Sequence, residues 1–293
     1  MLLNKRFSLI PSIKPTIKSK VTNQTISLLG LEISNWDLGG QASFRSKYLA
    51  HKENYFSHIQ SVFYIIDIQA KERFDETLTY LKDIVNAIQE INPDFSQFLI
   101  LFHKHDPDLK NNKQILENID FLEKQIKVIN PNVNFTYYRT SIYDESSLIR
   151  AFSDGAISIT QRSKLIQTLL KEYTKKTYSS AAVLLDQQSF IIASRSTKES
   201  YQQICESIAP RLAYTIEKLE DWDIDTVDIV TNIRFPENIE ANKEGIIFLR
   251  KLKVNDERLY LTSLCLNKKI KAKSYEYLPI LANNLKNLLE SLD

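Results

Sequence analysis

Three short polar motifs contain the side chains of this sequence that are best suited to chemistry. They are Trp36-Asp37-Leu38-Gly39-Gly40-Gln41, His103-Lys104-His105-Asp106 and Arg139-Thr140-Ser141-Ile142-Tyr143-Asp144-Glu145. Their carboxylates, imidazoles, amide and hydroxyls can bind a polar ligand, a metal ion or a water. Each motif follows a hydrophobic run that predicts a strand, and ligands of parallel α/β sheets sit beyond the carboxyl ends of the strands. The three motifs therefore predict one shared ligand site.

Each motif also has a plainer interpretation. Residues 36–41 could be a strand end followed by a glycine turn, and residues 103–106 a charged loop. His103 and His105 share one strand face and could bind a metal, but no third ligand follows at a suitable spacing. Asp144 is better explained as a helix N-cap than as a catalytic acid.

The first half of the chain alternates strand-like and helix-like segments. We expect strands at 25–29, 31–36, 61–68, 97–102 and 135–139, a polar loop at 39–54, and helices at 72–91, at 112–129 and from Asp144 toward Ser153. The runs SVFYIIDI and QFLILF are apolar on both faces, which is typical of buried parallel strands. This order predicts an α/β domain with a mostly parallel sheet covered by helices.

The second half has a different rhythm. We expect helices at 161–176, 198–219 and 275–292, and strands at 180–185, 190–194, 227–233, 245–254 and 258–266. Neighbouring strands separated by short polar turns are typical of hairpins. The sequence therefore predicts a second, α+β domain with a mixed or antiparallel sheet.

Composition narrows the class of protein. The 293 residues carry 38 basic and 36 acidic side chains, a net charge of +2 that gives no overall footprint for nucleic acid or an anionic membrane. No segment approaches the roughly 18 apolar residues that span a bilayer, and no signal peptide is visible. Cys205 and Cys265 have no metal-ligand spacing, which favours buried thiols in a reducing compartment. We expect a cytoplasmic protein without direct membrane insertion and without a nucleic-acid partner.

In order and spacing, the three motifs resemble those of Rag-type GTPases of the Ras superfamily. The WDxGGQ motif also resembles that of the Arf branch. The resemblance covers about residues 10–155 by motif and the rest by element order alone. It implies a Ras-superfamily G domain over 1–155, with a P-loop-NTPase-like sheet, and a roadblock/longin-like dimerisation domain over 160–293. The second half is an analogy at the level of the fold.

The resemblance implies a GTP or GDP site with Mg²⁺. Asp37 would hold Mg²⁺ through a water, the N–H of Gly40 would meet the γ-phosphate, and Gln41 would orient the attacking water. Thr16 would be the second Mg²⁺ residue, although a simple exposed turn explains it as well.

The same resemblance implies a guanine pocket. The Asp106 carboxylate would accept two hydrogen bonds from the guanine edge, and the Lys104 stem would lie along the base. His103 stands where the superfamily consensus NKxD has Asn. A backbone N–H within Thr140, Ser141 and Ile142 would face the guanine oxygen.

One element of the family is not found in this sequence. No GxxxxGK[ST] occurs, and the resemblance places Met1 to Phe7 near the end of the family's first helix. We expect weak or absent GTP binding, because that loop supplies most contacts to phosphate and Mg²⁺. We also expect a gap between strands 31–36 and 61–67 that closes, or is filled by Arg6 to Ile10 or by another chain. A start assigned too late, a shortened pseudo-GTPase and a split gene each explain the pattern.

Two functions follow from these observations. The first is a guanine-nucleotide-dependent signalling switch. The second is a nucleotide-free adaptor that dimerises through 160–293. Either would pair with itself or with another Rag-like or roadblock protein, and a partner could recruit it to a membrane.

Overall fold

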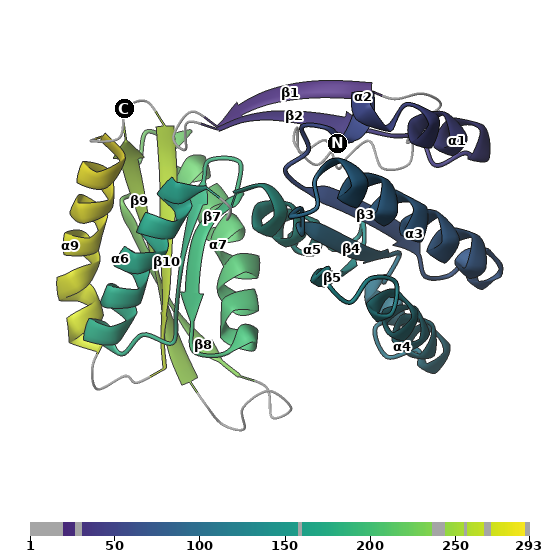
Figure 1. Ribbon diagram of the computed structural model, residues 1–293. Helices are drawn as coiled ribbons and strands as arrows, with labels where there is room; N and C mark the ends of the chain where they lie inside the picture. Colours follow the sequence, from purple (N-terminus) through teal and green to yellow (C-terminus); the bar gives the residue numbers. More distant parts are fainter. Residues whose placement is uncertain are drawn as a thin grey trace. The chain divides into compact units, whose positions relative to one another are not determined.

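The computed structural model describes residues 20–26, 31–157, 160–235, 244–254, 257–266 and 271–290. The chain divides into two compact units. The first comprises Met1–Thr25 with Glu32–Ala156, and the second comprises Ile26–Leu31 with Ile157–Asp293. Each unit contains its own sheet and its own covering helices (Figure 1).

The sheet of the first unit is parallel, as the apolar runs predict. It consists of β3 (Val62–Asp67), β4 (Phe98–His103) and β5 (Phe135–Thr140) in the order β3-β4-β5. The ladder aligns Asp67 with His103 and His103 with Thr140. The carboxyl ends of the three strands therefore meet at one edge, and each ends on a polar residue.

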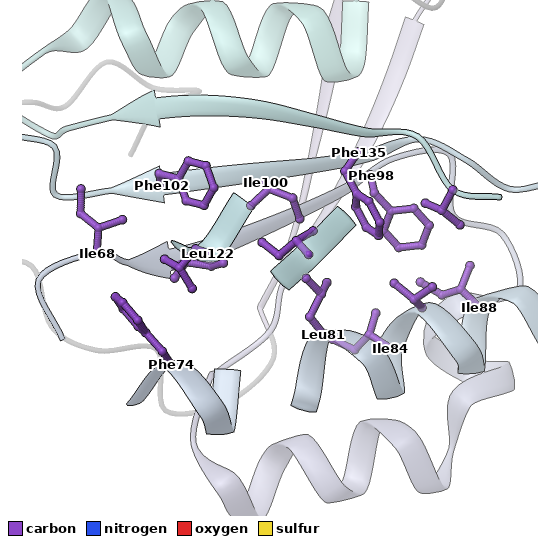
Figure 2. Packing of buried hydrophobic residues seen from close by; sticks show 14 of the residues in the cluster. Ile68, Phe74, Leu81, Ile84, Ile88, Phe98, Ile100, Phe102, Leu122 and Phe135 are labelled. Carbon is purple, nitrogen blue, oxygen red and sulfur yellow. The ribbon is translucent and has the colours of Figure 1, made fainter. Parts of the chain in front are cut away.

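The helices of the first unit hold this edge in place. They are α3 (Phe74–Ile91), α4 (Lys113–Lys127) and α5 (Glu145–Phe152), which continues into the π-helical turn η6 (Ser153–Ile157). Short 3₁₀ turns, η4 (Lys71–Arg73) and η5 (Pro107–Leu109), precede α3 and α4. Figure 2 shows Phe98, Ile100 and Phe102 of β4 among Leu81, Ile84 and Ile88 of α3 and Leu122 of α4. Burial of this apolar cluster is the main force that packs both helices on the sheet.

The predicted polar loop at 39–54 is wrong. It contains α1 (Ala42–Ala50) and α2 (Lys52–Phe56). The sequence shows no helical repeat of apolar residues here, because each helix has a single buried residue, Tyr48 in α1 and Phe56 in α2. Tyr48 and Phe56 pack in the apolar cluster of the unit, and Arg45 pairs with Glu76 and Lys52 with Glu90 of α3.

Strand β2 lies in a different sheet from the one expected. β1 (Lys20–Ile26) pairs with β2 (Leu31–Asp37) in a separate two-stranded sheet. Within the described ranges, no strand bridges β2 and β3, and the expected gap is not closed by their direct pairing. Arg6 to Ile10, one of the expected fillers, lie outside the described residues, as do residues 27–29 of the first expected strand.

The second unit is a five-stranded antiparallel sheet with helices on both faces (Figure 1). Its strands, in the order β7-β6-β10-β9-β8, are β6 (Ala181–Asp186), β7 (Ile191–Ser196), β8 (Asp228–Arg234), β9 (Glu244–Val254) and β10 (Glu257–Cys265). Its helices are α6 (Gln161–Thr177), α7 (Glu199–Glu220) and α9 (Lys271–Glu290). Helix α9 begins four residues before the expected Tyr275. Cys205 and Cys265 are both buried, as expected.

Among the described residues, no helix is both long and apolar enough to cross a bilayer.

Candidate functional site

The ends of β4 and β5 bring the second and third polar motifs together. His103 and Thr140 are aligned in the ladder, and His103 Nδ1 lies 3.0 Å from Thr140 Oγ1. The N–H of His105 donates to the carbonyl of Thr140 at 3.1 Å. These bonds fix the 103–106 loop against the start of the 140–145 loop.

Ser141 joins the two loops a second time. Its hydroxyl donates a hydrogen bond to Asp106 Oδ1 and accepts one from the N–H of Tyr143 at 3.0 Å. Its own N–H donates to Ser147 Oγ at 3.2 Å. Ser141 is 1% exposed, so these bonds form in a largely dehydrated place, where polar groups are costly to leave unpaired. The Asp106 carboxylate is therefore held at a fixed position.

Lys104 has a partner that the sequence did not suggest. Its ammonium lies 2.6 Å from Asp67 Oδ2 at the end of β3. Asp67 Oδ1 also accepts the N–H of Gln69 at 3.0 Å, and Gln69 Nε2 donates to the Lys104 carbonyl at 2.9 Å. Lys104 has a φ of 65°, a left-handed conformation that is uncommon for residues with a side chain. Asp67 and Gln69 thus orient a strained loop residue at the site.

A sequence signal for Asp67 existed but was missed. Asp67 ends the apolar run of β3 as His103 ends that of β4. A polar residue at the carboxyl end of a buried parallel strand belongs to the same class of candidates as the others.

The first motif is organised by tyrosines of α1 and α2. Asp37 is the last residue of β2 and is exposed. The buried Gly39 donates its N–H to the Tyr48 hydroxyl at 3.2 Å. The Tyr48 ring packs edge-on against Tyr55, which packs edge-on against Trp36. The chain before and after the glycines is thereby held by one aromatic cluster.

Gly40 and Gln41 follow in a more open place. A Cβ added to Gly40 would meet no atom within 4 Å, and its backbone is not left-handed. Neither crowding nor strain within the protein explains this glycine. Gln41 is exposed and is the N-cap residue of α1, but its side chain makes no capping bond. Its side chain is thus available to a ligand. Thr16 lies outside the described residues.

Burial sets the charge state of the two histidines. Desolvation lowers the pKa of His103 and also that of His105, where the Arg139 charge acts in the same direction. His105 is buried, and its Nε2 has no hydrogen-bond partner. Both rings are therefore neutral near pH 7. The described residues contain no group of three His, Cys, Asp or Glu side chains that could hold a metal ion.

Asp144 occupies the N-cap position of α5, although its side chain makes no capping bond. It accepts hydrogen bonds from Ser146 Oγ at 2.7 Å and from Lys110 at 3.2 Å. Burial raises the pKa of Asp144, but these two partners outweigh burial and leave the pKa below its usual value. An ionised, paired carboxylate is a poor general acid, which agrees with a structural role.

The ladder thus unites His103, Lys104, Asp106, Thr140 and Ser141 at one edge. Asp37 ends β2, and Gly40 and Gln41 follow it in the same unit, but β2 is hydrogen-bonded to β1 in the separate two-stranded sheet. The strand register therefore fixes the residues of the second and third motifs relative to one another and does not fix the first motif relative to them.

Known proteins share this sequence pattern. The family model of the Gtr1/RagA G protein conserved region matches residues 10–219. GTP-binding protein gtr1 of Schizosaccharomyces pombe is 24% identical over 184 residues, which are 61% of this chain and 58% of that protein. The chain therefore matches less than two thirds of the length of this relative.

Similar solved structures include a small GTPase and an MglB. The Arl6 BBS3 small GTPase from Trypanosoma brucei with bound nucleotide analogue GppNp is 17% identical, covers 48% of this chain and 78% of its own, and has a TM-score of 0.39. Myxococcus xanthus MglB is 13% identical, covers 45% of this chain and 93% of its own, and has a TM-score of 0.34. The match to the family model spans well over half of the chain and includes all three polar motifs. The chain therefore belongs to the Gtr1/RagA family of G proteins.

Proposed function

We propose that the chain is a Rag-type switch whose first unit binds the base of GTP or GDP. The observation that carries the proposal is the fixed Asp106 carboxylate, held by the Ser141 hydroxyl beside the aligned ends of β4 and β5. A guanine edge presents N1–H and an amino group, and a carboxylate accepts hydrogen bonds from both. The match between the carboxylate and the guanine edge would make the site selective for guanine.

Two further contacts support the same pocket. Since the N–H of Ser141 is used by Ser147, we propose that Ile142 supplies the N–H that faces the guanine oxygen. Lys104, held by Asp67, would place its stem along the base. The pocket is thus assembled before a ligand arrives, which reduces the entropic cost of binding.

The first motif would serve phosphate and metal. Gly40 lies in open space, which allows its N–H to approach a phosphate closely. Asp37 and Thr16 would hold Mg²⁺, and the ion would neutralise phosphate charge when bound. Gln41, with its free side chain at the start of α1, would orient a water for hydrolysis. Residues 1–293 contain no GxxxxGK[ST], so we propose that base contacts dominate and that this chain binds nucleotide more weakly than micromolar.

Competition against a fluorescent GDP tests base recognition. We would titrate the full chain with GDP, XDP and ADP in the presence of Mg²⁺. Asp106→Asn replaces an acceptor with a donor that matches the C2 carbonyl of xanthine, so the preference should move from GDP to XDP. Asp108→Asn, an exposed carboxylate two residues away, is the matched control and should keep the GDP preference. Equal competition by ADP and GDP, or an unchanged preference in Asp106→Asn, would refute the guanine pocket.

A second candidate function is an adaptor that dimerises through the second unit. β8 is an edge strand of the sheet, so one of its sides has no strand partner among the described residues. Val230 on β8 is 42% exposed, and Trp222 and Val227 just before it are exposed as well. An apolar edge strand can pair with the same edge of a second chain and form one continuous sheet.

Light scattering after size exclusion of the full chain tests this adaptor function. A dimer is expected, and Val230→Lys should shift it toward monomer because a lysine on an edge strand opposes pairing. Leu165→Lys on α6, a helix of the same unit, is the matched control and should leave the dimer intact. A monomeric wild type at high concentration, or a dimer that survives Val230→Lys, would count against self-pairing through β8.

A further inference from the structure

The second unit carries a cluster of lysines that the balanced net charge conceals. The C-terminal part of α6 lies beside the N-terminal part of α9, as the contact between Lys273 and Tyr178 shows and as Figure 1 displays. Both segments are rich in lysine. We call the following residues the lysine patch: Lys171, Lys175, Lys176, Lys271 and Lys273.

The patch is exposed, and its lysines form no ion pairs among the described residues. All five side chains belong to exposed residues, and none forms an ion pair within the described part of the chain. Elsewhere, lysines of the same kind are paired along helices, for example Lys124 with Asp120 and Lys218 with Asp221. Glu172 and Glu276 are the acidic residues on the same helical segments, so positive charge remains in excess.

Two local features beside the lysine patch lower the stability of the fold. Tyr178 has a φ of 53°, which is costly for a bulky side chain. α9 starts with Lys271 and Lys273 and has no acidic residue in its first turn, although the helix dipole favours anions there. Residues that disfavour the local backbone conformation or the helix start are typical of a surface with a function.

Two half-exposed aromatic rings border the patch. Tyr178 is 65% exposed, and its ring centroid lies 5.0 Å from Lys273 Nζ; Tyr275 is 53% exposed. Tyrosine rings with a polar tip are enriched where protein meets the headgroups of a bilayer. Lysines act as flexible point charges without the directional fork of arginine, which suits a fluid anionic surface better than one defined carboxylate.

We propose that the lysine patch binds the surface of an anionic membrane. Clusters of four to eight basic residues on a helical surface are attracted to acidic lipid headgroups, and the attraction decays within a Debye length. The second unit would adsorb without inserting a helix into the bilayer. This attachment is independent of nucleotide binding by the first unit.

Co-sedimentation of the full chain with vesicles tests the proposal. Vesicles of phosphatidylcholine alone should leave the protein in solution, and vesicles that also contain phosphatidylserine should sediment it. Raising the salt to about 0.5 M should release it, because screening shortens the range of the attraction. Lys175→Gln with Lys176→Gln and Lys273→Gln should weaken the partition at least about tenfold.

The matched control changes three paired lysines on α4 of the first unit: Lys113→Gln with Lys124→Gln and Lys127→Gln. It alters the net charge by the same amount and should retain binding. Circular dichroism would check that both variants are folded. The proposal is overturned if the wild type does not sediment with vesicles that contain phosphatidylserine, or if both triple variants lose binding equally. It is also overturned if polyglutamate binds the patch while vesicles do not. The last result would point to an acidic protein partner.

Discussion

The Ser141 hydroxyl donates its hydrogen bond to the Asp106 carboxylate, although 35 residues separate the two in the chain. The bond crosses from the loop after β5 to the loop after β4. It connects the two motifs that the Rag resemblance assigns to the guanine base. The position of Asp106 therefore depends on a side chain that would not itself touch the base edge.

Ser141→Ala should weaken guanine selectivity. Loss of the hydroxyl removes a donor to Asp106 and an acceptor for the N–H of Tyr143. Stability should fall by about 1 kcal/mol, because a buried group loses its partner, and GDP binding should fall by roughly tenfold. Urea unfolding and the GDP competition assay measure the two effects. Ser57→Ala, which removes a bond within an exposed turn, is the control and should change neither.

Tyr48→Phe should loosen the glycine loop while it preserves the aromatic packing. Phe keeps the contact with Tyr55 but leaves the buried N–H of Gly39 without its acceptor. We expect a loss of about 1–2 kcal/mol in the free energy of unfolding. Fluorescence of Trp36, which packs on Tyr55, should respond locally. Tyr55→Phe keeps the edge-on ring contacts and serves as the control, and equal losses in both variants would contradict the role of the Tyr48 hydroxyl.

The sequence predicts most of the central elements because their hydrophobic patterns are strong. The runs of β3 and β4 are apolar on both faces, and α3 presents one apolar stripe, so length and spacing decide the assignment. The sequence also predicts that His103 and Thr140 lie close together, since the carboxyl ends of neighbouring parallel strands meet at one edge.

Other features have no local pattern that a sequence could show. Helices α1 and α2 are held by tertiary contacts, through Tyr48 and Phe56 in the apolar cluster and through the ion pairs with α3. The pairing of Lys104 with Asp67 requires knowledge of the strand order. The lysine patch joins helices that are almost 100 residues apart in the chain, so the overall net charge gave no hint of it.

The protein should lose stability as the pH falls through the titration range of its buried histidines. Burial lowers the pKa of His103 and of His105 below 6.5, so the unfolded chain binds more protons in this range. Their contribution is complete above pH 6.5 and is lost progressively as the pH falls through the folded-state pKa values. Urea unfolding at pH 7.5 and at lower pH values measures this slope.

NMR titration of the imidazole signals identifies the histidines responsible. Two of the four histidines should titrate below the normal range. His103→Asn with His105→Gln should flatten the pH dependence, and the exposed pair His51→Gln with His58→Gln should leave it unchanged. Normal titration of His103 and His105 would show that burial does not control these two rings.

Gly155→Ala tests the packing of η6 on the parallel sheet, and Gly40→Ala tests the contact with a nucleotide. A Cβ on Gly155 would overlap with Phe63 Cζ and lie 2.8 Å from Leu99 Cδ2, both on the face of the parallel sheet that packs on α5 and η6. Such overlap forces the sheet and the turn apart, so we expect a loss of about 1–3 kcal/mol in the free energy of unfolding. Thermal or urea unfolding measures it.

Gly40→Ala adds the same methyl group where nothing lies within 4 Å, so the free energy of unfolding should stay the same. Its effect should appear only with nucleotide: the methyl group would obstruct a phosphate approaching the Gly40 N–H, and GTP should lose more affinity than GDP because it alone has the γ-phosphate. Equal losses for GTP and GDP would place the γ-phosphate elsewhere. A destabilised Gly40→Ala protein would instead mean that the loop packs more tightly in solution than its open surroundings indicate.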